Sequence, residues 1–275
     1  MVKERLDVLL LERGLVDSHE RGRRLILAGQ VYVQGQRVDK AANRAAREAA
    51  IEIRALPPYV GRGGQKLAHA LATFGLAPAG QVAADVGAST GGFTDCLLQA
   101  GALRVYAIDV GYGQLSWSLR QDPRVVVMER TNARYLERLP EAVELVTLDV
   151  SFISLRLILP RVAGWLAPEG QVVALVKPQF EAGADMVGRG GVVRDPATHR
   201  QVLSGVITWA QENGWWAHGV VRSPLRGAKG NIEFLLWLSR QAAAPLPGLP
   251  ELLAEATEPA AHLSGDNDDD AAMAD

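Results

Sequence analysis

The chain has 275 residues, of which 48% are hydrophobic and 22% are charged, as is typical of a folded globular protein. It contains no run of 18 apolar residues, and Glu12 and Arg13 interrupt the apolar stretch near the N-terminus, so we expect neither a transmembrane helix nor a signal peptide. The single cysteine, Cys96, excludes an internal disulfide and a cysteine-cluster zinc site, and we expect a cytoplasmic protein.

The net charge of −2 conceals an uneven distribution of charge. Residues 241–275 hold eight acidic and no basic residues, so the rest of the chain has 29 basic and 23 acidic residues and a net charge of about +6. A basic body suits a polyanionic partner. The Ala- and Pro-rich, then acidic, end predicts a disordered tail over 241–275 that is solvated. The alternative is an inhibitory tail that mimics phosphate.

The first 58 residues are predicted to form a small domain. An apolar i, i+3, i+4 pattern predicts a first helix that ends at Gly14. A second helix follows a cap at Asp17 or Ser18. Residues 31–38 alternate like a β-hairpin, and residues 51–54 alternate like a strand that closes the small sheet.

This unit resembles the S4 RNA-binding domain. The resemblance is carried by Arg5-Leu6-Asp7, Gly14-Leu15, Ser18, Ile26, Gly29, Val31, Val33 and Gly35. It implies contact with structured RNA, whose phosphate oxygens match the geometry of a guanidinium group. The alternative for these arginines is a solvated helix face. The candidate RNA-binding residues are Arg5, Arg21, Arg23, Arg24 and, in the linker that follows, Arg62.

A linker over 59–64 leads to a second domain over 65–240, in which strand and helix patterns alternate. We predict strands at 82–85, 104–109, 124–128, 145–149, 171–176, 217–222 and 232–238, and helices at 65–74, 93–100, 114–120, 155–165 and 198–214. Such alternation predicts an α/β fold with a mostly parallel, seven-stranded sheet and helices on both faces. A ligand is then expected beyond the carboxyl ends of the strands.

Residues 84–95, Ala-Asp-Val-Gly-Ala-Ser-Thr-Gly-Gly-Phe-Thr-Asp, form a glycine-rich turn between a strand and a helix. Glycine lets the backbone approach a ligand closely, and the first N–H groups of a helix are free to bind one. The spacing is neither G-x-G-x-x-G nor a P-loop. The leading acid suits a ligand with a cationic amino group, such as S-adenosylmethionine; the alternative is an ordinary turn. The candidate cofactor contacts are Asp85, Gly87, Ala88, Ser89, Gly91, Gly92 and Phe93.

Two later strand ends offer further contacts to a cofactor. Asp109 closes the second strand, where an acid accepts hydrogen bonds from both hydroxyls of a ribose, and Val110 follows it. Asn132 follows the third strand, where its amide meets an adenine edge or, alternatively, caps a helix. These positions indicate a cofactor that contains a nucleoside.

Asp149 ends the fourth predicted strand, and Lys177 ends the fifth. A lysine after five apolar residues is costly to desolvate unless it is paired or functional. A neutral amine at this place can abstract a proton. The alternative is a lysine at the end of a strand whose ammonium group reaches solvent.

Lys66 and Glu233 would be assigned to the surface if each were considered alone. Together with Asp149 and Lys177 they resemble the Lys-Asp-Lys-Glu tetrad of FtsJ-type RNA 2′-O-methyltransferases. This resemblance implies that Lys177, helped by Asp149, deprotonates a ribose 2′-hydroxyl. Lys66 would supply positive charge and Glu233 would orient one of the lysines. Asp149 would also contact the cofactor, and no metal is implied.

The combination with an S4 domain is similar to the TlyA-type family of hemolysins and rRNA 2′-O-methyltransferases. The similarity covers about residues 3–240, through the motifs at 62–64, 85–95, 109–115, 149–155, 176–181 and 190–193. It implies a Rossmann-like, class I S-adenosylmethionine-dependent methyltransferase domain behind an α+β S4 domain. It also implies ribosomal RNA, free or in a ribosomal subunit, as the partner, with a cytidine of the large subunit or of both subunits as the target.

Several basic residues are expected in loops that flank the strand ends, where they would hold RNA near the site. They are Arg189, Arg194, Arg222, Arg226 and Lys229.

Three other functions are open at this point. A base methyltransferase would show Asn/Asp-Pro-Pro-Tyr/Phe after the fourth strand, or a catalytic cysteine at a strand end, whereas residues 149–152 are Asp-Val-Ser-Phe and Cys96 lies in a predicted helix. The complete tetrad argues against a non-catalytic RNA-binding or ribosome-assembly factor. The lack of a transmembrane span or strongly amphipathic cationic helix argues against a cytolysin, and we expect no membrane partner.

Overall fold

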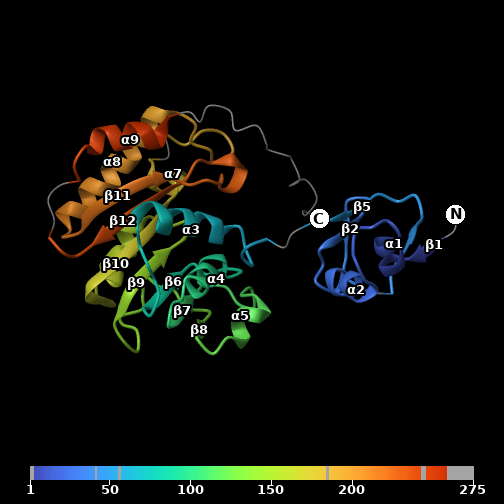
Figure 1. Cartoon of the computed structure of the whole chain (residues 1–275). Coiled ribbons are helices and arrows are strands. Elements are labelled where there is room, and N and C mark those ends of the chain that lie inside the picture. The colour runs from blue at the N-terminus through green and yellow to red at the C-terminus, as the bar shows by residue number, and fades with distance from the viewer. Residues whose placement is uncertain (1–2, 41, 55–56, 184–185, 243–245, 259–275) are drawn as a thin grey trace. The chain divides into compact units, whose positions relative to one another are not determined.

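A computed structural model describes residues 3–40, 42–54, 57–183, 186–242 and 246–258. The chain divides into two compact units, with the boundary between Pro58 and Tyr59 (Figure 1). In the described residues, no helix has both the length and the apolar character needed to cross a membrane.

The described residues of the first unit form two helices and two small sheets. The helices are α1 (Leu6–Glu12) and α2 (His19–Leu27), and the Ser18 side chain caps α2 by accepting a hydrogen bond from the Arg21 amide. Strands β2 (Val31–Val33), β3 (Gln36–Val38) and β5 (Ile51–Ile53) form an antiparallel sheet in the order β3-β2-β5. The sequence did not predict the separate pair of β1 (Lys3–Arg5) and β4 (Arg44–Ala46), because these short strands lack apolar alternation.

The second unit contains a seven-stranded sheet in the order β11-β12-β10-β9-β6-β7-β8. Its strands are β6 (Val82–Val86), β7 (Arg104–Ile108), β8 (Val125–Met128), β9 (Val143–Leu148), β10 (Leu166–Val176), β11 (Trp216–Arg222) and β12 (Phe234–Ser239). The pairs within β10-β9-β6-β7-β8 are parallel, whereas β12 is antiparallel to both β10 and β11. The expected seven-stranded, mostly parallel α/β sheet is therefore confirmed.

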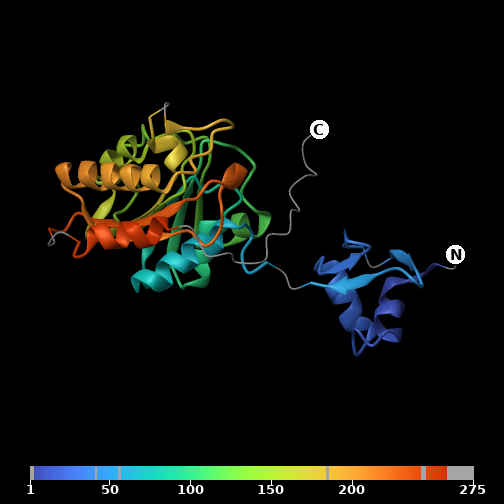
Figure 2. The ribbon, with the colours of Figure 1, turned by 90° about the horizontal axis from the view of Figure 1, so that it is seen from above.

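Helices cover both faces of this sheet (Figures 1 and 2). Side chains of α3 (Gly63–Phe74), α4 (Gly92–Gln99) and the region of α5 (Trp117–Gln121) form one buried core with Ala83 and Val173. Side chains of α6 (Leu159–Val162), α8 (Pro196–Glu212) and α9 (Leu249–Thr257) form the other core with Ala84 and Val172. The short elements are η1 (Leu155–Leu157), α7 (Pro178–Glu181) and η3 (Ala228–Gly230).

The prediction of disorder over 241–275 is wrong for α9. Leu253 and Ala256 are buried in the same core as α8, so the tertiary structure provides an apolar surface that the local composition does not reveal. Residues 259–275, which carry most of the expected acidic tail, lie outside the described residues. The predicted helix over 155–165 is also divided, into η1 and α6.

Candidate active site

The site lies where β6, β7, β9 and β10 reach their carboxyl ends. Parallel pairing brings these ends to one edge, and Asp109, Asp149 and Lys177 each come directly after a strand. Glu233 directly precedes β12, whose first residue pairs with Val176 at the end of β10. The antiparallel direction of β12 therefore brings a residue from the beginning of a strand to the same edge.

The glycine-rich turn between β6 and α4 passes close to this edge. Gly87 has a φ of +85°, and a Cβ atom here would overlap the carbonyl oxygen of Asp149. Glycine is therefore required both for the backbone conformation and for the close approach of the two chain segments.

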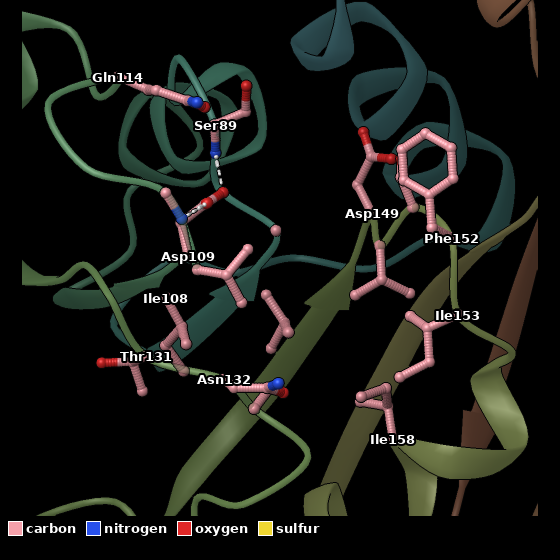
Figure 3. Close-up of a pocket in the computed structure, with 17 residues that line it drawn as sticks. Ser89, Ile108, Asp109, Gln114, Thr131, Asn132, Asp149, Phe152, Ile153 and Ile158 are labelled. Carbon is pink, nitrogen blue, oxygen red and sulfur yellow. Dashed lines mark hydrogen bonds between the residues drawn. The ribbon is translucent and has the colours of Figure 1, made fainter.

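A cavity of about 490 Å³ opens beside this turn (Figure 3). Its apolar walls include Ile108, Ile153 and Ile158. Of the cofactor contacts expected from the sequence, it is lined by Gly87, Ser89, Asp109, Val110, Asn132 and Asp149. A smaller cavity of about 140 Å³ is lined by Ala88, Gly92 and Phe93 and shares Gly87, Ser89 and Asp149 with the larger one.

Asp109 is fixed by two backbone amides (Figure 3). The amide of Ser89 donates to Oδ2 over 2.7 Å, and the amide of Gly111 donates to Oδ1 over 2.6 Å. A carboxylate has about four acceptor positions, so each oxygen retains capacity for a second donor, such as a ribose hydroxyl.

Two expected cofactor contacts line neither cavity. Asp85 is fully buried and accepts hydrogen bonds from Thr94 (2.7 Å) and Thr147 (3.1 Å). Burial raises the pKa of this carboxyl to about 7, although the two hydroxyl donors oppose the rise. Gly91, with a φ of +98°, packs against Leu119 on the core side of the turn. For these two residues, the structure supports a role in shaping the turn.

Asn132 makes a local hydrogen bond and also lines the larger cavity. Its Oδ1 atom accepts a hydrogen bond from the Arg134 amide over 3.0 Å, as in a local turn. Its side chain nevertheless lines the larger cavity.

Lys177 is held by two partners at the end of β10. Its Nζ atom lies 2.6 Å from Oδ1 of Asp149 and donates to the hydroxyl of Ser151 over 2.8 Å. The lysine side chain is 10% exposed and the aspartate 23%. Asp149 lines both cavities, so this ion pair holds the lysine at the end of β10 next to them.

Lys66 and Glu233 form a second ion pair. Nζ of Lys66 donates to Oε2 of Glu233 over 2.5 Å, and the two side chains are 11% and 3% exposed. Of the two lysines, it is therefore Lys66 that Glu233 contacts. With all four groups ionised, the two pairs together are formally neutral.

The second pair is connected to the first through α3 and β12. Gly63, one turn before Lys66 on α3, comes close enough to Asp149 that an added Cβ would lie 3.8 Å from Oδ2. Strand β12 pairs with β10, which ends at Lys177. The fold thus brings the four residues of the expected tetrad to one edge of the sheet.

The structure adds one aromatic residue that the sequence reading did not select. Phe152 is 90% exposed, has a φ of +62°, lines the larger cavity, and lies 5.0 Å from the ring of Phe180 between centroids. An exposed aromatic residue with positive φ is uncommon and costs energy. The signal available in the sequence was its position three residues after Asp149, in the loop that follows β9.

The expected RNA-binding arginines of the first unit differ in their surroundings. Arg5 and Arg23 both donate to the carboxylate of Asp7, over 2.9–3.0 Å, and these arginines hold the pKa of Asp7 well below its usual value. Arg21 pairs with Asp17, whereas Arg24 is exposed on α2. In the second unit, Arg62 is exposed at the start of α3.

In the described parts of the chain, no group of three or more His, Cys, Asp or Glu side chains is arranged to hold a metal ion. Cys96 is buried on α4 and lines neither of the two cavities described above.

Comparison with known families accounts for both units. Residues 59–240 match the FtsJ-like methyltransferase family, and residues 4–49 match the S4 domain.

Several relatives match this chain over most of their own length. The chain is 51% identical to "Putative rRNA methyltransferase YqxC" of Bacillus subtilis, covering 86% of this chain and 85% of the relative. It is 48% identical to 16S/23S rRNA (cytidine-2'-O)-methyltransferase TlyA of Mycobacterium tuberculosis, and the match covers 87% of this chain and 91% of that relative. A solved structure entitled "Putative hemolysin from Streptococcus thermophilus" is 44% identical, with a TM-score of 0.71 and coverage of 93% and 96%.

Proposed function

The chain belongs to the FtsJ-like methyltransferase family, in its TlyA-type branch, and we propose that it methylates the 2′-hydroxyl of a cytidine in ribosomal RNA with S-adenosylmethionine as methyl donor. The observation that carries the proposal is two lysine–carboxylate contacts with both lysines buried, Lys177–Asp149 and Lys66–Glu233, beside a cavity that contains Asp109. The relative from Mycobacterium tuberculosis is named for the same reaction.

The residues around the two cavities fit the methyl donor. Asp109 would accept the ribose hydroxyls, and the apolar side chains of Ile108, Ile153 and Ile158 would contact the adenine. The close backbone at Gly87 would lie beside the amino acid part, in the smaller cavity. When bound, the donor supplies an electrophilic methyl group on a sulfonium.

Lys177 is the residue that would receive the proton of the 2′-hydroxyl. It must be neutral to do so, with its own proton already released to solvent, and the contact with Asp149 would stabilise the ammonium that forms when the amine takes the hydroxyl proton. Ser151 fixes the direction of the amine through its hydroxyl. Positioning of the hydroxyl by these groups contributes to the rate as well, because the reacting atoms are then held in place.

Lys66 would stabilise the negative charge that develops on the ribose oxygen. Glu233 holds Lys66 in one orientation and balances its charge in the resting site. The Lys66 ammonium would stabilise this charge because it is already oriented. In a region with little water, a donor fixed in this way is more effective than one in solution.

The S4 unit would bring the enzyme to its substrate. S4 domains are RNA-binding modules, and the proposed contacts to phosphate are Arg5, Arg21, Arg23 and Arg24 of this unit, with Arg62 of the second unit. A substrate in ribosomal RNA would require the protein to act in the cytoplasm, which is the compartment that the sequence leads us to expect.

Transfer of labelled methyl groups tests this function. Purified ribosomal subunits and free ribosomal RNA are incubated with the protein and labelled S-adenosylmethionine, with Lys177→Ala as the comparison. We expect one nucleotide that resists alkaline cleavage, with at least a hundredfold loss of label in the variant. Label on a base, or equal label from the variant, would contradict the proposed chemistry.

The name hemolysin on a related structure does not provide a competing mechanism. Liposome leakage caused by the purified protein would be the observation that favours a cytolysin.

A further inference from the structure

A second large cavity lies at the same edge of the sheet, beyond β12. Its volume is about 540 Å³. We call it the basic cleft; it is lined by Val192, Val193, Arg194, Pro196, Arg222, Arg226, Lys229, Gly230, Ile232 and Thr257. Arg222 ends β11 and pairs with Phe234, the residue that follows Glu233 of the tetrad.

The basic cleft carries positive charge without a matching acid. Four of its lining residues are cationic and none is acidic. Among the residues that the structure describes, none of these four cations forms an ion pair. Asp195 is next to Arg194 in the chain, but its carboxylate accepts hydrogen bonds from the first amides of α8.

Arg222 is partly buried among these cations. Burial lowers the pKa of its guanidinium group the most, and the positive charge of Arg226 lowers it further. Its guanidinium group donates to the carbonyl oxygen of Glu258 over 2.8 Å, a neutral partner. A cleft in which cations repel one another is favourable for an anionic ligand.

The walls of the basic cleft are held in a fixed arrangement. Asn231 is 2% exposed and connects them: its Nδ2 atom donates to the carbonyl oxygens of Gly191 and Ala228, and its Oδ1 atom accepts from the Val193 amide. Lys229 has a φ of +55°, a left-handed conformation that is uncommon for a lysine. The lysine is thus presented by a strained and well-supported turn.

The same loop touches the tetrad. Gly227 packs against Glu233 so closely that a Cβ atom would overlap Oε1, while Lys66 bonds the other oxygen. The Ser223 amide also donates to the carbonyl oxygen of Glu233 over 2.9 Å. Glu233 and the loop that contains Ser223 and Gly227 therefore lie between a ligand in the basic cleft and the proposed catalytic lysines.

We propose that the basic cleft binds backbone phosphates of the RNA strand that carries the target ribose. This rests on the proposed function, because it takes RNA as the substrate. Phosphates are the repeated anions of such a strand, and arginine matches their geometry. Contacts of this kind place the ribose against the catalytic residues without reading the bases.

Charge removal at exposed positions tests the proposal. Arg194, Arg226 and Lys229 are exposed, so Arg194→Gln, Arg226→Gln and Lys229→Gln are combined, and Lys229→Gln is also made alone. The control is Arg240→Gln, an exposed arginine that follows β12 at the opposite end of the sheet. Binding of a ribosomal RNA fragment is measured from 50 to 200 mM salt, with methyl transfer and S-adenosylhomocysteine binding measured in parallel.

We expect the slope of log Kobs against log salt to become shallower by about 2 to 3 in the triple variant and by about 1 in Lys229→Gln. The KM for RNA should rise at least tenfold, while kcat at saturating RNA and cofactor binding stay within twofold of the unchanged chain. A slope like that of Arg240→Gln would overturn the proposal. If no RNA is methylated by the unchanged chain, the proposed function fails, and the salt slope still decides whether the cleft binds RNA.

Discussion

Lys66 and Glu233 are 167 positions apart in the chain, yet their Nζ and Oε2 atoms lie 2.5 Å apart in an almost fully buried ion pair. One residue comes from a helix on the face of the sheet, and the other directly precedes β12, which lies between β11 and β10. Two buried charges of this kind depend on each other, because each would be costly to leave without its partner.

Glu233→Gln is expected to destabilise the second unit by about 3 kcal/mol, since it leaves the buried Lys66 ammonium without a counter-charge. The double variant Lys66→Met, Glu233→Leu should recover most of this loss and still lack methyl transfer. All six tryptophans lie within 59–275, so urea unfolding followed by tryptophan fluorescence reports on this unit. A loss below 1 kcal/mol in Glu233→Gln would contradict the prediction.

Asp85 should make stability depend on pH. Its pKa is about 7 in the folded chain and 3.8 as the ordinary value, so between pH 4 and pH 7 the unfolded chain releases a proton that the folded chain retains. Stability therefore falls as pH rises through this window, and this contribution is constant above it. At about 1.4 kcal/mol per pKa unit, the total is a few kcal/mol.

The variant Asp85→Asn has no carboxyl group to titrate at this position, so it lacks this fall in stability between pH 4 and pH 7. The stability of the variant relative to the unchanged chain should rise from pH 4 to pH 7, as measured by urea unfolding at each pH. A difference that is the same at every pH would show that Asp85 does not titrate in this range.

Asp109→Asn is expected to weaken binding of S-adenosylhomocysteine at least tenfold, about 1.4 kcal/mol. The amide has one acceptor oxygen, so it cannot accept from both the Ser89 and Gly111 amides and a ribose as well. Calorimetric titration measures the affinity. The control Asp122→Asn makes the same chemical change at a surface pair with Arg124 and should stay within twofold.

Phe152→Ala should weaken RNA binding by about 1–3 kcal/mol if the exposed ring stacks on a base. Phe152→Gly removes the same ring and also relieves the positive φ, so it should be about 1 kcal/mol more stable than Phe152→Ala. The two variants should bind RNA equally weakly; RNA affinity equal to that of the unchanged chain in both would refute the stacking role.

Local sequence patterns were sufficient for most elements. The alternation of strands and helices predicted all seven strands of the large sheet, and Ser18 and Gly14 marked helix boundaries in the first unit. These signals are local, because caps, glycine conformation and apolar periodicity act within a few residues. Helix α9 was missed because the surface that buries Leu253 is formed by α8, far away in the chain.

The sequence by itself determined which residue types follow each strand, and through resemblance it grouped Lys66, Asp149, Lys177 and Glu233. Only the tertiary structure decided that Glu233 pairs with Lys66, since sheet order places β12 beside β10 and brings the start of β12 to the same edge. It also placed Asp85 beneath the glycine turn and gathered four cations in the basic cleft. Burial and counter-charge depend on neighbours that lie far apart in the chain, so the pattern of any one segment does not contain them.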